Sequence, residues 1–275
     1  SFPKLVDDPN YPKIDLTLFD EAHHNDSQRM KDLLMDPHRK EKCGTIYHFT
    51  ATPVNINKIN THNGSHFVYT FEQAIRNHLI RSYNVHVVFH LKTSSNTVLD
   101  EVAKISGDRF QRLLAFTGYT KHKNLPSNRH NVTDIVSEWN NPGKGYNVIG
   151  LSSDNPSNDR ATIKRFEDSN EGKLSVLVSC RKLGEGIDIK NIDGIVFVDP
   201  RKKKKDIFQI IGRGLRLFRD STGKPLDWSQ QTPCNIILDI AIDPPPSHPY
   251  LGYLMTGVLS HFEHFKEEFQ KAILE

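Results

Sequence analysis

The sequence predicts an α/β protein whose strands form parallel sheets. Short apolar runs alternate with amphipathic segments of helical spacing along most of the chain. No internal repeat or long low-complexity tract interrupts this alternation. Three successive prolines at 244–246 then break the pattern ahead of an aromatic-rich, predicted helical segment at 250–274. We therefore expect the C-terminal part of one α/β lobe at 1–80, a complete second lobe at 81–242 and a helical extension at 243–275.

The individual elements are predicted from the spacing of apolar residues. Strands are expected at 14–19, 45–49, 85–89, 113–116, 147–151, 174–179, 195–198 and 235–240. Helices are expected at 27–35, 72–80, 133–139, 159–167 and 206–218. The stretch 92–108 is polar and weakly patterned, and no element is predicted there.

The composition, with 36% hydrophobic and 25% charged residues, indicates a globular protein rather than a disordered one. The net charge of +3 does not by itself indicate a nucleic-acid partner, so local patches must carry that argument. Three widely spaced cysteines without a CxxC pair fit neither a disulfide framework nor a zinc site, and they favour a reducing, intracellular compartment. No apolar run approaches the roughly 18 residues of a membrane span, so no membrane partner is expected.

An acidic pair, Asp20 and Glu21, directly follows the first predicted strand. In a parallel sheet, ligands bind beyond the carboxyl ends of the strands. One carboxylate there can hold Mg²⁺ through its waters, and the other can orient an attacking water. Taken alone, the pair is also typical of the first turn of a helix, where acidic side chains meet the positive end of the helix dipole.

Two further strand ends carry small or flexible residues. The tetrapeptide Thr-Ala-Thr-Pro at 50–53 follows the second predicted strand and, alone, is better explained as an ordinary turn ended by proline. The segment Gly-Glu-Gly-Ile-Asp at 184–188 follows the strand at 174–179. Its glycines allow close approach to a phosphate, and Asp188 can accept a hydrogen bond from a ribose, although an ordinary glycine turn fits the pattern as well.

The segment 209–216 carries the most informative pattern. On a helix of about 100° per residue, Gln209, Arg213 and Arg216 fall within an arc of about 60°, opposite an isoleucine-rich face. Gly212 and Gly214 each cost up to ~1 kcal/mol in a helix compared with alanine, which suggests close approach on both sides. The fork of an arginine side chain suits a phosphate, whereas a solvated surface helix is the alternative. The basic run at 201–205 can follow a nucleic-acid backbone or form a solvated loop.

In their order along the chain, these stretches resemble the motifs of the superfamily 2 helicases. DEAH at 20–23 resembles motif II and TATP at 50–53 resembles motif III. LLAFTGYTKH at 113–122 is similar to motif IV, GEGID at 184–188 to motif V and QIIGRGLR at 209–216 to motif VI. The resemblance implies two RecA-like lobes with ATP between them, the first lobe incomplete in this chain. The segment YTFEQAI further resembles the helicase subunits of type III restriction enzymes.

The resemblance implies a role for each matching residue. Asp20 would serve Mg²⁺ and Glu21 the attacking water, while Arg213 and Arg216 would face the phosphates of ATP. Positions near the nucleotide would be Gly186, Asp188 and Gln209. Positions that couple nucleotide state to the second lobe would be His23, Thr50 and Thr52. Positions near the nucleic-acid backbone would be Thr117, Gly118 and Ser179.

One motif of the family, the phosphate loop G-x-x-x-x-G-K-[ST], does not occur in the sequence. We therefore expect an N-terminal half of the first lobe outside these residues, and a chain that is inactive alone although its parent is an ATP hydrolase. The restriction-type resemblance favours DNA over RNA. The alternative hypothesis is a binding module that is derived from a helicase lobe and grips nucleic acid or a partner without hydrolysis.

Overall fold

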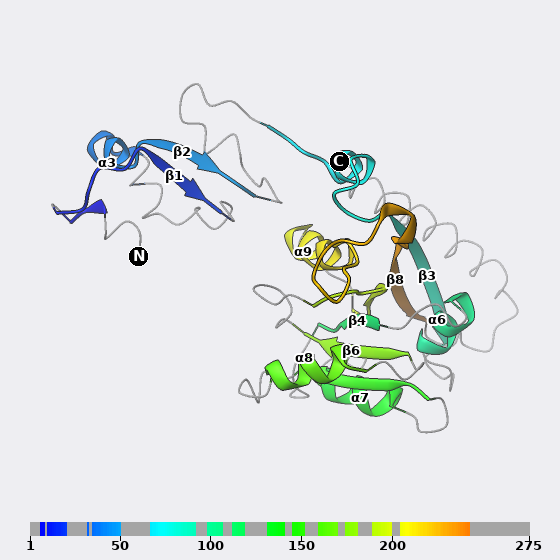
Figure 1. The fold of residues 1–275 in the computed structure, drawn as a ribbon. Helices are drawn as coiled ribbons and strands as arrows, with labels where there is room; N and C mark the ends of the chain where they lie inside the picture. Colours follow the sequence, from blue (N-terminus) through cyan, green and yellow to red (C-terminus); the bar gives the residue numbers. More distant parts are fainter. Residues whose placement is uncertain are drawn as a thin grey trace, which may run out of the picture. The chain divides into compact units, whose positions relative to one another are not determined.

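The computed structural model describes residues 6–8, 10–20, 32, 35–50, 67–91, 98–106, 112–118, 131–140, 145–151, 159–169, 174–180, 189–199 and 204–242 (Figure 1). The chain divides into two compact units, Ser1–Phe67 and Val68–Glu275.

The first unit contains a two-stranded parallel sheet of β1 (Leu16–Phe19) and β2 (Thr45–His48), connected through helix α3 (Pro37–Lys42). Helix α3 begins after Asp36, whose carboxylate accepts hydrogen bonds from the first free backbone N–H groups of the helix, and proline occupies its first turn. These backbone hydrogen bonds keep the pKa of the Asp36 carboxyl below its ordinary value.

A glycine turn places β2 beside β1. Gly44 has φ +62°, and a Cβ at this position would lie 2.3 Å from the carbonyl oxygen of Asp15. Only glycine fits both the left-handed backbone and the close approach. The next residue, Thr45, donates its N–H to the Asp15 carbonyl at 2.9 Å and so begins the pairing of the two strands.

The second unit is built on a six-stranded, fully parallel sheet with the strand order β3-β8-β7-β4-β6-β5. Its strands are β3 (Tyr83–Leu91), β4 (Arg112–Phe116), β5 (Asn147–Leu151), β6 (Ser175–Ser179), β7 (Gly194–Phe197) and β8 (Cys234–Ile242). From the central strand β4 the chain builds β5 and β6 on one side and then crosses to β7 and β8 on the other. The carboxyl end of β4 therefore lies at a topological switch point, where open parallel sheets bind their ligands.

Helices cover both faces of this sheet (Figure 1). The helices of the second unit are α5 (Phe71–Arg76), α6 (Val98–Ser106), α7 (Val132–Trp139), α8 (Asp159–Glu167), α9 (Lys204–Gly214) and the 3₁₀ turn η5 (Trp228–Gln230). Helices α8 and α9 share one hydrophobic cluster with the sheet, and α6 and α7 share another on the opposite face. Two cores separated by one sheet form a three-layer α/β/α unit.

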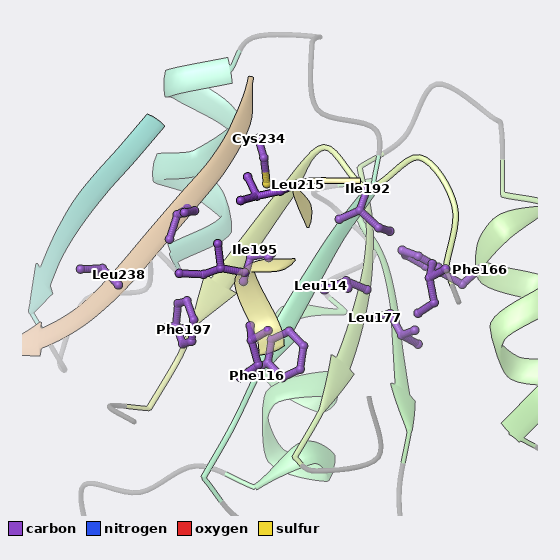
Figure 2. Close-up of a cluster of buried hydrophobic side chains, with 14 of the residues drawn as sticks. Leu114, Phe116, Phe166, Leu177, Ile192, Ile195, Phe197, Leu215, Cys234 and Leu238 are labelled. Carbon is purple, nitrogen blue, oxygen red and sulfur yellow. The ribbon is translucent and has the colours of Figure 1, made fainter. Parts of the chain in front are cut away.

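The core under α8 and α9 consists of alternate residues of the strands and the apolar side of the two helices (Figure 2). Leu114 and Phe116 of β4 point to this side, whereas Leu113 and Ala115 point to the core of α6 and α7. The period of two along a strand explains this division, because both faces of the sheet are buried.

The predicted α/β class with parallel strands is confirmed, and every strand expected from the sequence within the second unit is present. Helix α6 was missed, since polar residues surround its few apolar ones, of which Val98, Leu99 and Val102 are buried. Their spacing of one and then three residues was the signal of an amphipathic helix. The predicted helix at 27–35 falls mostly, and the extension at 243–275 entirely, outside the described residues.

The predicted helix at 206–218 is shorter than expected. Helix α9 ends at Gly214, so Arg216 follows the helix rather than lying on it. The predicted boundary between the two lobes at residue 80 stays a prediction, while the compact units of the structure divide after Phe67. Phe71 of α5 packs edge-on against Phe208 of α9, with ring centroids 5.5 Å apart, and so joins the core of the second unit.

A pH-dependent contact joins Tyr146, the residue before β5, to α6. The hydroxyl of Tyr146 donates to the Asp100 carboxylate at 3.1 Å, and burial together with this hydrogen bond raises the pKa of Tyr146 to about 12. Near pH 8, Tyr146→Phe is expected to lower the free energy of unfolding by about 1 kcal/mol through the lost hydrogen bond. Between the ordinary pKa of 10 and about 12, the unfolded tyrosine loses its proton before the folded one, so the wild type loses this advantage as the pH rises. Urea denaturation of both proteins at pH 8 and pH 11 measures the change, and a difference that is the same at both pH values would contradict it.

Candidate functional site

The carboxyl edge of the first unit's sheet carries the start of two predicted motifs. Asp20 follows β1 and is exposed, and Thr50 follows β2 by two residues. The strands are parallel and in register from Leu16 opposite Thr45 to Phe19 opposite His48, so both motifs begin at the same edge. This is the placement that the sequence predicted for two parallel strands.

His48 lies immediately before this edge and is partly buried. Its ring stacks on Phe19 with centroids 5.4 Å apart. Burial lowers the pKa of His48, which favours the neutral imidazole at neutral pH.

Five of the predicted site residues lie outside the described part of the chain, so the structure leaves their assignments as predictions. They are Glu21, His23, Thr52, Gly186 and Asp188.

The carboxyl edge of the second unit's sheet brings together the three positions predicted to lie near nucleic acid. Thr117 and Gly118 follow β4, and the backbone N–H of Thr117 donates to the carbonyl of Ser179, the last residue of β6, at 2.9 Å. The side chains of Thr117 and Ser179 are fully buried, whereas Gly118 is half-buried. Within the described residues, the Oγ atom of Ser179 has no hydrogen-bond partner. The three predicted positions are therefore neighbours, and Gly118 is the most accessible of them.

A residue that sequence reasoning missed, Asp199, holds this edge together. Its carboxylate is 2% exposed and accepts a hydrogen bond from the backbone N–H of Gly118 at 2.7 Å. A Cβ on Gly118 would lie 3.3 Å from the same carboxylate oxygen, so the contact is close. Asp199 follows β7, the strand next to β4, and its position directly after an apolar run was the available signal.

Helix α9 divides into a buried face and an accessible face, as its spacing predicted. Ile210, Ile211 and Leu215 lie in the core of the second unit. Gln209 and Arg213 are half-buried on the other side, while Arg216 is exposed beyond the end of the helix. In the part of the chain that the structure describes, the Nε2 donor of Gln209 is buried without a hydrogen-bond partner. A buried amide donor of this kind is unusual in proteins and points to a missing acceptor.

The two glycines of this segment differ in their surroundings. A Cβ on Gly214 would lie 2.5 Å from the Cys234 Sγ and 2.7 Å from the Cδ1 of Ile195, so this glycine allows the helix to approach the sheet. A Cβ on Gly212 would meet no described atom within 4 Å, so its side of the helix is open. The sequence predicted a close neighbour on both sides, and the structure supplies one on the Gly214 side.

A buried arginine, Arg81, was also missed. It is 1% exposed, and its guanidinium contacts backbone carbonyls at the end of α9. No local pattern marks it, because its partners are more than 100 residues away in the sequence.

In the described residues, no group of three or more histidine, cysteine, aspartate or glutamate side chains is placed to hold a metal ion. Among the helices of the described residues, none is sufficiently long and apolar to cross a membrane.

Comparison with known proteins gives a family match within the second unit. Residues 94–218 match the family described as helicase conserved C-terminal domain. A segment of 71 residues is 37% identical to IRC3 of Saccharomyces cerevisiae, a protein named as an ATP-dependent helicase. This segment is 25% of the present chain and 10% of the yeast protein, so the match spans a small part of that relative.

Two solved structures share the fold. A fragment of an HsdR subunit of a type I restriction enzyme from Vibrio vulnificus YJ016 aligns with a TM-score of 0.59 and 18% identity, over 87% of this chain and 46% of that one. The type ISP restriction-modification enzyme LlaBIII, solved bound to DNA, aligns with a TM-score of 0.60 and 17% identity, over 88% of this chain and 19% of that one. At these identities the likeness concerns the fold alone, and the chain spans less than half the length of either protein. Residues 94–218, which include strands β4 to β7 of the parallel six-stranded sheet and the whole of helix α9, thus match a helicase C-terminal domain.

Proposed function

We infer that this chain is the motor part of an ATP-dependent helicase or translocase that couples the hydrolysis of Mg-ATP to movement on nucleic acid. The observation that carries this proposal is the accessible side of α9. There a buried amide donor of Gln209 lacks a partner among the described residues, next to the open side of Gly212 and one turn before Arg213. Helicase-family membership of the same segment supports the assignment.

The residues of α9 fit the phosphates of a nucleotide. Gln209 supplies an amide donor, and Arg213 and Arg216 supply guanidinium groups, which bind phosphate oxygens through paired N–H donors. Gly212 leaves room for a ligand because no described atom lies within 4 Å of its missing Cβ. In this proposal the two arginines stabilise the charge of the transferring phosphoryl group. Gly186 and Asp188, from the motif V segment, complete the proposed nucleotide contacts.

The first unit would supply the metal and the attacking water. Asp20 is exposed at the end of β1 and would hold Mg²⁺ through water, while Glu21 would orient the nucleophile. A bound Mg²⁺ neutralises charge on the phosphate oxygens. His23, Thr50 and Thr52 would couple this edge to the second lobe.

An uncovered apolar face on the first unit supports the proposal that further chain completes this lobe. Leu16 and Leu18 of β1 are 51% and 59% exposed, and Tyr47 of β2 pairs with Leu18 and is 54% exposed. Parallel sheets normally have both faces covered, and two strands alone are not a stable sheet. In this proposal, an N-terminal half of the first lobe would bring the phosphate loop, a motif that does not occur in the sequence.

The proposed nucleic-acid contact is the carboxyl edge of the second sheet, at Thr117, Gly118 and Ser179. Because two of these side chains are buried, Gly118 would be the accessible point of the contact. DNA is favoured over RNA by the fold shared with restriction enzymes, one of which was solved on DNA. The cysteines form no disulfide among the described residues, which is compatible with the intracellular location that the sequence favours.

The experiment uses the longest protein that the gene encodes. We expect hydrolysis of ATP that requires Mg²⁺, is stimulated by double-stranded DNA and is abolished by EDTA. Phosphate release would be measured with DNA, with RNA and without nucleic acid, and affinity would be measured at several salt concentrations. Affinity should fall steeply as the salt concentration rises, because phosphate contacts release counterions.

The same measurements separate the alternative function. A binding module derived from a helicase lobe would bind nucleic acid in a salt-dependent way and hydrolyse no ATP under any of these conditions. That result would overturn the motor assignment and leave the fold assignment intact. Stimulation by RNA but not by DNA would reverse only the choice of nucleic acid.

A further inference from the structure

Arg81 donates hydrogen bonds to the backbone carbonyls at the C-terminal end of helix α9. Its Nη2 atom contacts the carbonyl of Gly214, and its Nε atom donates to the carbonyl of Arg216 at 2.9 Å. The backbone N–H of Arg81 donates to the carbonyl between them, that of Leu215, at 2.8 Å. One residue thus satisfies three successive carbonyls at the C-terminal end of the helix. Such carbonyls have no partner within a helix and carry its partial negative charge, which a cation complements.

The same guanidinium anchors this helix end to the amino-terminal edge of the sheet. Its Nη1 atom donates to the carbonyl of Thr232 at 3.0 Å, and its Nη2 atom also contacts the carbonyl of Ile192. Thr232 lies just before β8 and Ile192 just before β7, while Arg81 itself lies just before β3. Arg81 therefore joins the end of α9 to the starts of three adjacent strands.

The planar face of the Arg81 guanidinium also makes a contact. The Cζ atom of Arg81 lies 3.9 Å from the ring centroid of Phe218, a cation–π contact. Phe218 is itself fixed, because its N–H donates to the Oε1 of Gln231 at 2.7 Å and its carbonyl accepts from the Nε2 at 3.2 Å. The next residue, Arg219, exchanges two backbone hydrogen bonds with the side chain of Asn191, at 2.9 and 3.1 Å. The segment from Gly214 to Arg219 is thus held by side chains from elsewhere in the second unit.

None of the four described acceptors of Arg81 is a carboxylate, and the residue is 1% exposed. Burying a cation is costly, and burial lowers the pKa of Arg81 from its ordinary value, an effect that the nearby charge of Asp193 partly opposes. A merely structural link could be made by uncharged groups at lower cost. The fork of N–H donors is what this position uses, because it reaches four carbonyls in different directions.

We propose that Arg81 is a positioning residue for ATP hydrolysis, which fixes the end of α9 and the backbone of Arg216 so that Arg213 and Arg216 hold their places for the phosphates. This inference rests on the proposed function. Arg81 lies outside the stretch 94–218 that matches the helicase family, and the structure connects it to that stretch. It acts through Arg216 and touches no substrate in this proposal.

The test compares Arg81→Lys and Arg81→Ala with wild type in the longest encoded protein. Lysine keeps the charge but offers one compact ammonium, so it cannot reach all four carbonyls. Because a displacement of about 1 Å can cost 10²-fold in rate, we expect kcat per folded molecule to fall about 10-fold for lysine and about 10²-fold for alanine. The KM for ATP should change little, since Gln209 and the first lobe remain.

Phe218→Leu removes the cation–π contact but keeps the hydrogen bonds of Arg81 to the carbonyls. It should displace the end of α9 less and lower kcat by a smaller factor. Arg76→Ala, an arginine of α5 whose side chain is 75% exposed, is the matched control and should leave kcat unchanged.

A double-mutant comparison excludes a purely structural role. In an Arg216→Ala background, Arg81→Lys should lower kcat little further, because the group it positions is gone. A lower melting temperature with an unchanged kcat per folded molecule would overturn the proposal, and so would fully additive losses. If the wild type itself hydrolyses no ATP, the proposed function fails instead. Hydrogen exchange of the amides at 212–219 then still tests whether Arg81 fixes the end of α9. Faster exchange in Arg81→Lys would support this role, and unchanged exchange would overturn it.

Discussion

Replacing Arg216 by alanine is expected to lower ATP turnover by the longest protein that the gene encodes by about 10³- to 10⁵-fold, the contribution of an arginine that contacts a transferring phosphoryl group. Arg216 is exposed, so it lies outside the buried core, and its backbone carbonyl accepts a hydrogen bond from Arg81. Arg213→Ala should give a loss of the same order, because Arg213 lies three residues before Arg216, in the last turn of α9. Single-turnover hydrolysis, with ATP affinity measured separately, would show a loss in the chemical step.

The matched control for this experiment is Arg219→Ala. Arg219 lies three residues beyond Arg216, is mostly solvent-facing, and donates through its Nη1 to the Gly223 carbonyl at 2.7 Å. Its removal should leave turnover within about twofold of wild type, because a surface substitution away from the site has a small effect. Near-normal turnover by both Arg213→Ala and Arg216→Ala would remove the phosphate role from α9. An equal loss in Arg219→Ala would point to a general effect of positive charge.

Replacing Gly214 by alanine is expected to destabilise the second unit by about 1–3 kcal/mol, the usual cost of overpacking. The added Cβ would lie 2.5 Å from the Cys234 Sγ and 2.7 Å from the Cδ1 of Ile195. Both residues are fully buried, so neither side chain can move away freely. Alanine normally stabilises a helix by up to ~1 kcal/mol relative to glycine, so the expected sign is opposite to the helix propensity. Urea denaturation of the 275-residue chain measures the difference.

Gly212→Ala, two residues earlier in the same helix, is the control. No described atom lies within 4 Å of the position that its added Cβ would take, so alanine there should raise stability by up to ~1 kcal/mol. In the proposed function the same methyl group occupies space on the nucleotide side, and turnover should fall while stability rises. If both variants changed the free energy of unfolding equally, the close approach of α9 to the sheet could not explain the effect of Gly214→Ala.

Local patterns in the sequence were sufficient for the α/β class and for the strands. Runs such as Leu113 to Phe116 are apolar on both faces, which indicates strands of a buried parallel sheet, and each lies in a parallel ladder. The family resemblance also rested on short motifs, and the match at 94–218 confirmed it. The two-sided character of α9 followed from its 3.6-residue period, with Ile210 and Ile211 buried and Gln209 less so. These features depend on residues near one another in the chain, which is why the sequence alone could determine them.

Tertiary structure decided what depends on distant residues. Helix α9 ends at Gly214, although its pattern continues to Phe218, because Arg81 takes the carbonyls that a longer helix would have used. The acceptors of Arg81 are 111 to 151 residues away in the sequence, and no local spacing encodes them. Asp199 likewise meets Gly118 across 81 residues, since β4 and β7 become neighbours only when the sheet forms. The chain's pattern thus determined which segments become strands and helices, while the packing of the sheet determined which side chains meet at its two edges.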